Sequence, residues 1–132
     1  MIIHLGDTSQ DGGYIRKKYP QKTRLINGNC DLMKLGEDES VISLEGVKIF
    51  ACHGHGYSVK HTLSRLAMRA KELGCSVALY GHTHSAGELE VDGVLTVNPG
   101  TLSRYSNKSY CYMIITESKV VTKIVYTDER NV

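Results

Sequence analysis

The sequence predicts an α/β fold whose second half is rich in strands. Four short apolar runs each stop at a glycine-flanked polar residue, which is the pattern of buried strands that deliver side chains at their carboxyl ends. Between the third and fourth runs lies a stretch with apolar residues at helical spacing. The last third of the chain carries paired strand-like runs joined by short turns. At 132 residues, the chain has the size of a single domain.

The first two apolar runs begin the chain. Met1–Leu5 predicts a buried strand that leads to Asp7, and Thr23–Ile26 predicts a second strand that leads to Asn29. Between them, Tyr14–Tyr19 predicts a short helix that ends there, because the proline that follows disfavours a helical residue before it. In open α/β sheets ligands bind just beyond the carboxyl ends of strands, so Asp7 and Asn29 are candidate ligands.

The third run belongs to a predicted hairpin. Val41–Leu44 and Val47–Phe50 flank Glu45-Gly46, a two-residue connection of the kind that joins antiparallel strands. The second of these strands leads to His53, which a glycine follows directly. The hairpin therefore places a third candidate ligand, the imidazole of His53, just beyond the end of a strand.

A helix is predicted from Ser58 to Leu73. Ser58 is suited to cap the first turn, and Gly74 is placed to end the helix. His61 lies opposite the apolar stripe and is interpreted as a solvent-facing residue. The stripe that would pack on the sheet consists of Val59, Leu63, Leu66, Ala70 and Leu73.

The fourth run organises the rest of the chain. Val77–Tyr80 is a short continuous apolar run bounded by glycines, as in a strand buried on both faces. It stops at Gly81, and His82 and His84 follow. Residues two apart on an extended chain point to the same side, roughly 6 to 7 Å apart, so these two histidines can serve one metal or two adjacent metals.

Two hairpins are predicted after the histidines. Gly87–Val91 and Val94–Val97 flank Asp92-Gly93, the strongest short hairpin signal in the chain. Tyr110–Thr116 and Val120–Tyr126 follow and are expected to close the domain as an antiparallel pair.

The composition excludes several classes of protein. The formal charge is +2, from 16 basic and 14 acidic residues, which is too balanced for a nucleic-acid or membrane-surface footprint. We find neither an apolar run of membrane-spanning length nor a signal-like N-terminus, and we expect a cytoplasmic protein. The four cysteines form no Cys-x-x-Cys pair, so we expect no disulfide. They are Cys30, Cys52, Cys75 and Cys111.

Taken together, the strand ends predict a metal site. A lone Asp after a strand is usually a turn former, and an isolated His-x-His is weak evidence for a metal. Each of these interpretations accounts for one residue alone. None of them explains why residues that can bind a metal follow four separate strands. The candidate metal ligands are Asp7, Asn29, His53, His82 and His84.

In this order the residues resemble the calcineurin-like metallophosphoesterases, in particular the small single-domain phosphodiesterase branch. The family pattern runs Asp-x-His, Gly-Asp, Gly-Asn-His-Asp/Glu, His and Gly-His-x-His, with an Asn-Pro-Gly-Ser turn in the small branch. The resemblance extends from Met1 to about Tyr126 and implies a two-sheet β-sandwich with flanking helices. The matching stretches are Gly6-Asp7, Gly28–Asp31, His53–His55, Gly81–His84 and Asn98–Thr101.

The chain departs from the family pattern in two places. The first block, an Asp-x-His at the end of the family's opening strand, is absent, so the first strand and helix of the family are missing from this sequence. Cys30 stands where the broader family places the histidine credited with protonating the leaving group. This replacement is common in the small branch.

The resemblance implies a two-cation site that hydrolyses a phosphoester, with Asp7 as the bridging carboxylate. One metal position is then complete, with Asp7, Asn29, His53 and His82, whereas the other keeps only Asp7 and His84. Mixed imidazole and oxygen ligands suit Mn²⁺, Ni²⁺, Zn²⁺ or Fe²⁺, and we expect Mn²⁺. We therefore predict one well-occupied metal and one weak or empty position.

Three residues near these ligands have open roles. His55 either contacts substrate phosphate, as Asn29 also would, or supports the ligand His53 from behind. Cys30 is an acid, a substrate contact or a bystander. Asp31 either orients neighbouring groups or only forms the turn.

Loss of the opening strand would leave the edge of the Met1 strand open, and an open apolar edge favours pairing, so we expect a homo-oligomer. The leading hypothesis is a metal-dependent phosphodiesterase that acts on a small phosphoester. The alternative is a weakly active or inactive binding module, because the phosphoesterase-like subunit of the retromer coat has this fold and works as a scaffold. A metal-free truncation product without function is a third reading.

Overall fold

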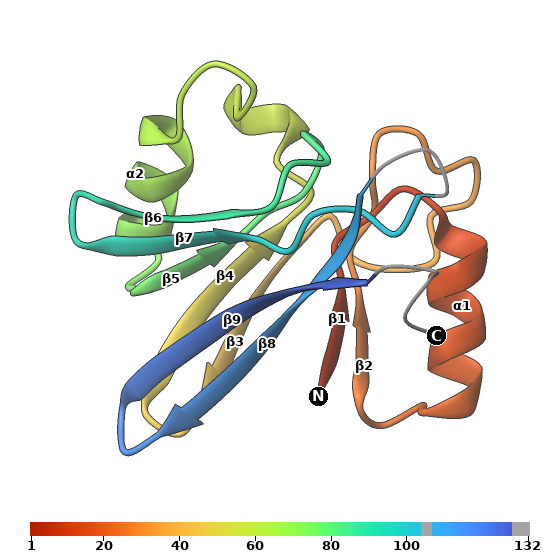
Figure 1. Ribbon diagram of the computed structural model, residues 1–132, viewed down its shortest axis with the longest axis horizontal. Coiled ribbons are helices and arrows are strands. Elements are labelled where there is room, and N and C mark those ends of the chain that lie inside the picture. The colour runs from red at the N-terminus through yellow and green to blue at the C-terminus, as the bar shows by residue number, and fades with distance from the viewer. Residues whose placement is uncertain (104–106, 128–132) are drawn as a thin grey trace.

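The computed structural model describes residues 1–103 and 107–127, whose strands form three sheets (Figure 1). Two α-helices and one short 3₁₀ helix, η1, accompany the nine strands of the described part. In chain order the elements are β1 (Ile2–His4), α1 (Ser9–Lys18), β2 (Thr23–Leu25), β3 (Glu39–Leu44), β4 (Val47–Cys52), η1 (His55–Tyr57), α2 (Ser64–Glu72), β5 (Val77–Leu79), β6 (Gly87–Val91), β7 (Val94–Asn98), β8 (Lys108–Thr116) and β9 (Lys119–Thr127).

The largest sheet has the order β3-β4-β5-β7-β6. Its three inner strands run parallel, and a hairpin partner flanks them antiparallel on each side. Val77, Ala78 and Leu79 of β5 are all buried, which confirms the prediction of a strand covered on both faces. Because β4 and β5 are parallel, their carboxyl ends meet at one edge of the sheet and bring the segments that follow them together.

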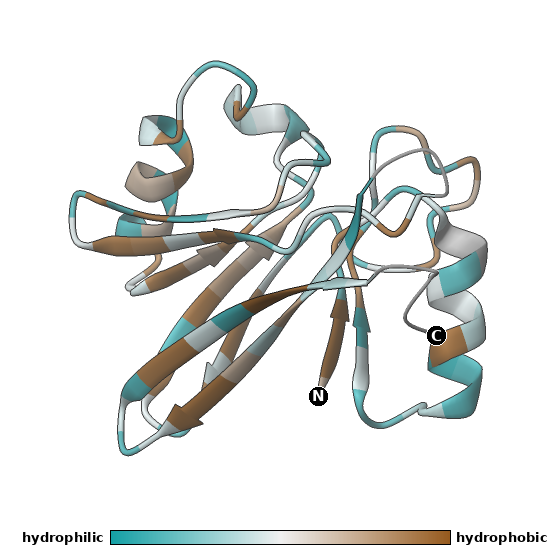
Figure 2. Cartoon of the chain, viewed as in Figure 1, coloured by the Kyte–Doolittle hydropathy of each residue, from teal (hydrophilic) through white to brown (hydrophobic). Residues whose placement is uncertain are grey.

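A second layer packs on one face of this sheet. It consists of the parallel pair β1–β2 and the antiparallel pair β8–β9. Between the layers lies a core that contains Ile49, Val77 and Val97 of the large sheet, against which Ile3 and Met113 of the second layer pack. The expected two-sheet sandwich is therefore confirmed, and Figure 2 shows the hydrophobic residues concentrated on its strands.

The helices flank this sandwich. On the other face of the large sheet, α2 buries Leu66, Ala67 and Ala70 against Phe50 and Ala78. The other α-helix, α1, lies beside β2 (Figure 1). No described helix is long and apolar enough to cross a membrane.

Three predictions about individual elements were wrong. The helix expected over Tyr14–Tyr19 already begins at Ser9, because the N–H groups of Asp11 and Gly12 donate to the carbonyl of Thr8 and start the first turn there. The helix expected from Ser58 begins at Ser64, because Ser58 is left-handed (φ 55°) and its carbonyl accepts hydrogen bonds from His61 and Thr62 in a turn. The first strand is not buried as expected: Ile2 is 37% exposed, because among the described strands β1 pairs with β2 alone.

The three predicted hairpins are confirmed, each with a two-residue connection. Asp92 and Gly93 have φ values of 50° and 82°, as type I′ turns require, and Glu45 and Gly46 adopt the same geometry. The connection of β8 to β9 is made by Glu117 and Ser118, which reach positive φ without a glycine.

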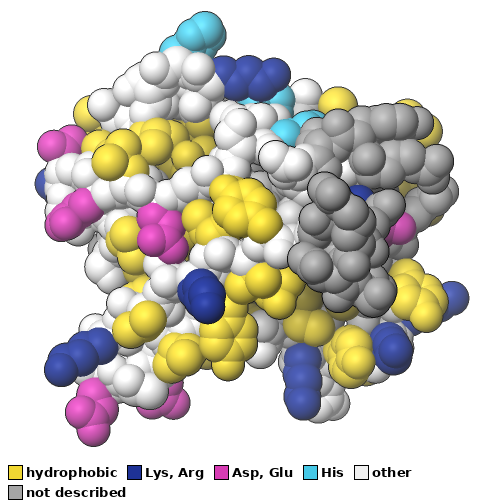
Figure 3. All heavy atoms as spheres, viewed as in Figure 1, with side chains coloured by type: hydrophobic (Ala, Val, Ile, Leu, Met, Phe, Trp, Pro, Cys, Tyr) yellow, Lys and Arg dark blue, Asp and Glu magenta, His cyan; other side chains and the backbone are white. Residues whose placement is uncertain are grey.

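Outward-facing residues of β8 and β9 form an apolar surface. Alternate residues of the pair point away from the core, and Figure 3 shows hydrophobic side chains gathered over these strands. The large exposed members are Tyr110, Tyr112, Ile114 and Val121.

Candidate metal centre

Three predicted ligands converge at one point of the structure. Asp7 lies between β1 and α1, His53 follows β4, and His82 follows β5. One ligand atom from each of the three lies within 4.8 Å of the others. Nε2 of His53 is 3.3 Å from Oδ2 of Asp7 and 3.2 Å from Nδ1 of His82. The parallel pairing of β4 and β5 brings His53 and His82 together, as the strand ends predicted, and Asp7 joins them from the end of β1 in another sheet.

The tautomer of His53 suits a metal ligand. Its Nδ1 lies 2.7 Å from the carbonyl oxygen of Leu5, which only accepts hydrogen bonds, so Nδ1 carries the proton. The lone pair of Nε2 then faces Asp7 and His82. An imidazole held through its second nitrogen by a carbonyl is the usual support of a metal-bound histidine.

The spacing of the three atoms fits a transition metal. Ligand atoms about 2.1 Å from a shared cation lie roughly 3.0 to 3.4 Å from one another in octahedral or tetrahedral arrangements. The two measured separations, 3.2 and 3.3 Å, fall in this interval. A carboxylate with two neutral imidazoles is a donor set for Zn²⁺, Fe²⁺, Ni²⁺ or Mn²⁺ rather than for calcium.

Two glycines permit the close approach of the segments. A Cβ atom on Gly6, which has φ 100°, would lie 2.7 Å from both the backbone nitrogen of Gly28 and Nδ1 of His53. A Cβ atom on Gly28 would overlap the carboxylate and backbone nitrogen of Asp7. Asp7 itself is left-handed, with φ 54°. A strained backbone packed this tightly is typical of functional sites.

The buried carboxylate of Asp31 orients the ligand loop. Its Oδ2 accepts hydrogen bonds from the backbone N–H of Asp7 at 3.0 Å and from that of Gly28 at 2.8 Å. Nearby, the N–H of Cys30 donates to Oδ1 of Asp7 at 2.8 Å. Of the two roles left open by the sequence, the structure supports orientation of neighbouring groups.

Electrostatics keep the imidazole of His82 neutral. Burial lowers its pKa most, and His53, Lys60 and His55 lower it further, whereas Asp7 opposes them. A neutral imidazole has a free lone pair, so His82 is ready to bind a cation near neutral pH.

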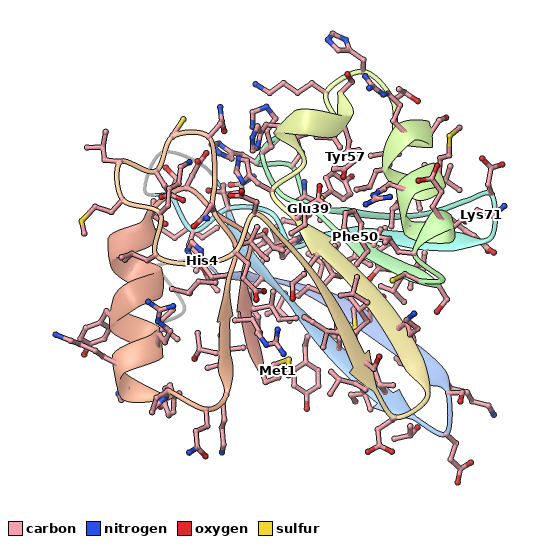
Figure 4. The ribbon with its side chains drawn as sticks, turned by 180° about the vertical axis from the view of Figure 1, so that it is seen from behind. Met1, His4, Glu39, Phe50, Tyr57 and Lys71 are labelled. Carbon is pink, nitrogen blue, oxygen red and sulfur yellow. The ribbon has the colours of Figure 1, made fainter. Side chains whose placement is uncertain are left out.

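His4 has a separate structural role. Burial lowers its pKa, and its Nδ1 accepts a hydrogen bond from the N–H of Gly6 at 3.3 Å. Figure 4 shows the side chain between β1 and α1. His4 is therefore a packed, hydrogen-bonded histidine.

Other candidates lie outside the convergent group. His84 is exposed and left-handed (φ 61°), as is the backbone of His82 (φ 67°), so the chain here is not the extended strand that the spacing argument assumed. Asn29 and Cys30 are exposed on the loop after β2. The ring of His55 is exposed, with its centroid 5.4 Å from that of His53. Their assignment as ligands or substrate contacts stays a prediction.

Asn98 is a positioning residue that is not among the predicted ligands. It is fully buried, and its Nδ2 donates to the carbonyl oxygen of Gly81 at 3.3 Å and to Oγ1 of Thr83 at 2.8 Å. These bonds fix the backbone on both sides of His82. The Asn-Pro-Gly-Thr stretch, which begins with Asn98 at the end of β7, was the available sequence signal.

Two known proteins are similar to this chain in sequence. A probable metallophosphoesterase of Bacillus subtilis, YsnB, is 34% identical over 104 residues, 77% of this chain and 59% of that protein. The chain thus spans less than two thirds of this relative's length. The phosphodiesterase MJ0936 of Methanocaldococcus jannaschii is 38% identical over 69 residues, 52% of this chain and 38% of the relative.

A solved structure shows the same fold. The crystal structure of wild-type Vps29 complexed with Zn²⁺ from Entamoeba histolytica superposes with a TM-score of 0.69 at 22% identity, covering 93% of this chain and 77% of that one. The sequence profile of the calcineurin-like phosphoesterase superfamily domain matches residues 1–119. This chain belongs to the calcineurin-like phosphoesterase superfamily.

Proposed function

We propose that this protein is a metal-dependent phosphodiesterase that uses Mn²⁺ to hydrolyse a small phosphodiester. The convergence of Asp7, His53 and His82 within 4.8 Å carries the proposal, because these residue types hold a divalent cation. A phosphodiesterase and a probable metallophosphoesterase among the relatives support it.

The chemistry follows from the charge of the substrate. A phosphodiester resists hydrolysis because its anionic oxygens repel a nucleophile and its leaving alkoxide is poor. A bound divalent cation supplies Lewis-acid polarisation and acidifies a water molecule near neutral pH. Asp7, His53 and His82 hold the cation, and Asp31 holds Asp7 in position.

The two metal positions differ in this proposal. Asp7, Asn29, His53 and His82 form the occupied position. Asp7 and His84 alone serve the second, which remains weak or empty. Metal analysis of protein dialysed against Mn²⁺ is expected to give about one tightly held ion per chain; two would contradict the assignment, unless a second chain supplies ligands.

Hydrolysis of bis(p-nitrophenyl) phosphate in the presence of Mn²⁺ tests the activity. His82→Ala is expected to lower turnover at least about 100-fold, because it removes a ligand of the occupied position. His61→Ala is the matched control, since His61 is exposed and is not part of the convergent group. Equal turnover of wild type and His82→Ala would sink the proposal.

The alternative is a catalytically weak or inactive binding module. The incomplete second position favours it, and so does the structural likeness to Vps29, a protein named for vacuolar protein sorting. The same assay separates the two functions. Wild-type protein that binds Mn²⁺ but gives no turnover would favour the binding module.

A further inference from the structure

A cleft opens beside the candidate metal centre. It has a volume of about 430 Å³, within the range of small-molecule sites, and lies between the segment that precedes α2 and the loop that joins β5 to β6. Its lining residues are Val59, Lys60, Leu63, Tyr80, Thr83, Ser85, Ala86 and Gly87.

The walls of the cleft combine apolar surface with hydrogen-bond donors. Val59, Leu63 and Ala86 contribute apolar surface, and Lys60 is the only charged residue among the described residues that line it. Oγ1 of Thr83 already accepts hydrogen bonds from Nδ2 of Asn98 and the N–H of Ser85. A hydroxyl whose two lone pairs are used this way can only donate, so Thr83 offers a donor.

Two residues connect the cleft to the metal centre. Thr83 lines the cleft and directly follows His82. Lys60 lines the same cleft as Thr83, so its ammonium group belongs to the cleft that adjoins His82 in the chain. A phosphoryl group at the metal centre therefore has Lys60 and the cleft beside it.

We propose that this cleft binds an uncharged, mainly apolar or aromatic ester group of the substrate, while Lys60 stabilises the negative charge of the phosphoryl group. The inference rests on the proposed function, because it needs a phosphoryl group at the metal centre. A single ammonium matches the single charge of a diester, and the lining side chains that the structure describes include no carboxylate that would repel it. A substrate with a second anionic phosphate in the cleft would meet no second cation among the described residues that line it.

Binding of two inert phosphonates tests the cleft without any turnover. Isothermal titration calorimetry of the Mn²⁺-loaded protein would compare the monomethyl esters of phenylphosphonate and methylphosphonate, named below by their parent phosphonates, because each monoester carries one negative charge, as a diester does. Both place the same charged group at the metal, and only the first carries an aromatic ring. We expect phenylphosphonate to bind about tenfold more tightly, since the half-open cleft would remove part of the ring from water.

Gly87→Leu would fill the cleft with little risk to the fold. A Cβ atom at Gly87 meets no heavy atom within 4 Å, and the residue does not have a positive φ. The variant is expected to bind phenylphosphonate only as tightly as methylphosphonate, with methylphosphonate affinity unchanged. Gly56→Leu is the matched control, because a Cβ atom there also meets open space and Gly56 does not line the cleft.

Lys60→Ala tests the role of the charge. It is expected to weaken both phosphonates by a similar factor, about two- to fivefold, and added salt should reduce this difference. Lys71→Ala, on the exposed surface of α2, is the control (Figure 4).

The outcomes distinguish the two proposals. Equal affinity for both phosphonates, or a preference that Gly87→Leu leaves intact, would overturn the cleft inference while the phosphoesterase function stands. Failure of the Mn²⁺-loaded protein to bind either phosphonate would overturn both.

Discussion

The carboxylate of Asp31 accepts a hydrogen bond from the backbone N–H of Asp7, 24 residues earlier in the chain. Since Asp31 also accepts from Gly28, its charge stabilises two backbone groups of the metal loop. Asp31→Asn is expected to weaken Mn²⁺ binding about tenfold, as loss of a supporting residue does. Calorimetric titration with Mn²⁺ measures this. Asp92→Asn, in an exposed turn, is the control. An unchanged affinity would limit Asp31 to a structural role.

Gly28→Ala should disrupt the centre itself. The added methyl group would overlap Asp7, so either the ligand loop or the turn after β2 must move. We expect Mn²⁺ binding to be lost and the free energy of unfolding to fall by about 2 kcal/mol or more. Gly56→Ala, which meets open space, should change neither. Wild-type Mn²⁺ affinity in Gly28→Ala would show that the loops are not packed as described.

Stability should depend on pH through His4. Burial lowers the pKa of His4 in the folded protein, so the unfolded chain takes up a proton first as the pH falls below about 6.5. The effect of His4 on the free energy of unfolding is therefore absent above that pH, and the free energy of unfolding decreases as the pH falls below it. In metal-free protein, the melting temperature of His4→Gln should fall less between pH 7.5 and 5.5 than that of wild type. His61→Gln should match wild type, and an identical fall in all three would contradict this.

The thiols should differ in reactivity. Cys30 is exposed, whereas burial raises the pKa of the Cys52 thiol to about 12. Ellman's reagent is expected to modify Cys30 within minutes at pH 8 and Cys52 only after unfolding. Cys30→Ser should lose the fast phase. Because all four cysteines are free, denatured protein should release four equivalents, and a lower number would point to a disulfide.

The open edge of β1 predicts self-association. Ile2 and His4 direct their backbone groups toward β2, so those of Ile3 point the other way, where no described strand pairs with them. We expect sedimentation velocity to show a dimer.

Ile3→Pro, which removes the outward N–H, should shift the protein toward monomer, whereas Ile3→Val, which keeps it, should not. A monomer at all concentrations would refute the edge pairing.

Local signals explain which features the sequence predicted. The turn at Asp92-Gly93 is encoded by two adjacent residues. The rule that ligands gather beyond the carboxyl ends of strands predicted that Asp7, His53 and His82 lie close together. Features set by distant contacts were not predictable. The support that Asp31 gives to Asp7 spans 24 residues.

The start of α2 and the place of His84 show the same limit. Ser58 has the residue type of a helix cap, yet its backbone closes a turn in a left-handed conformation. His84 has the spacing of a second ligand, yet β5 ends at Leu79, and both His82 and His84 are left-handed. In both cases the backbone angles depend on contacts with distant parts of the chain, which residue type and spacing do not predict.

The tips of two hairpins touch far from the metal centre: the N–H of Ser118 donates to the carbonyl of Glu45 at 3.1 Å. Each hairpin closes over two residues, and such structures form within about 10 microseconds. The centre instead joins three segments that are distant in the chain, and closing those longer loops costs more entropy. During folding, the hairpins should therefore form early and the centre late, so the sandwich can exist before any cation is captured.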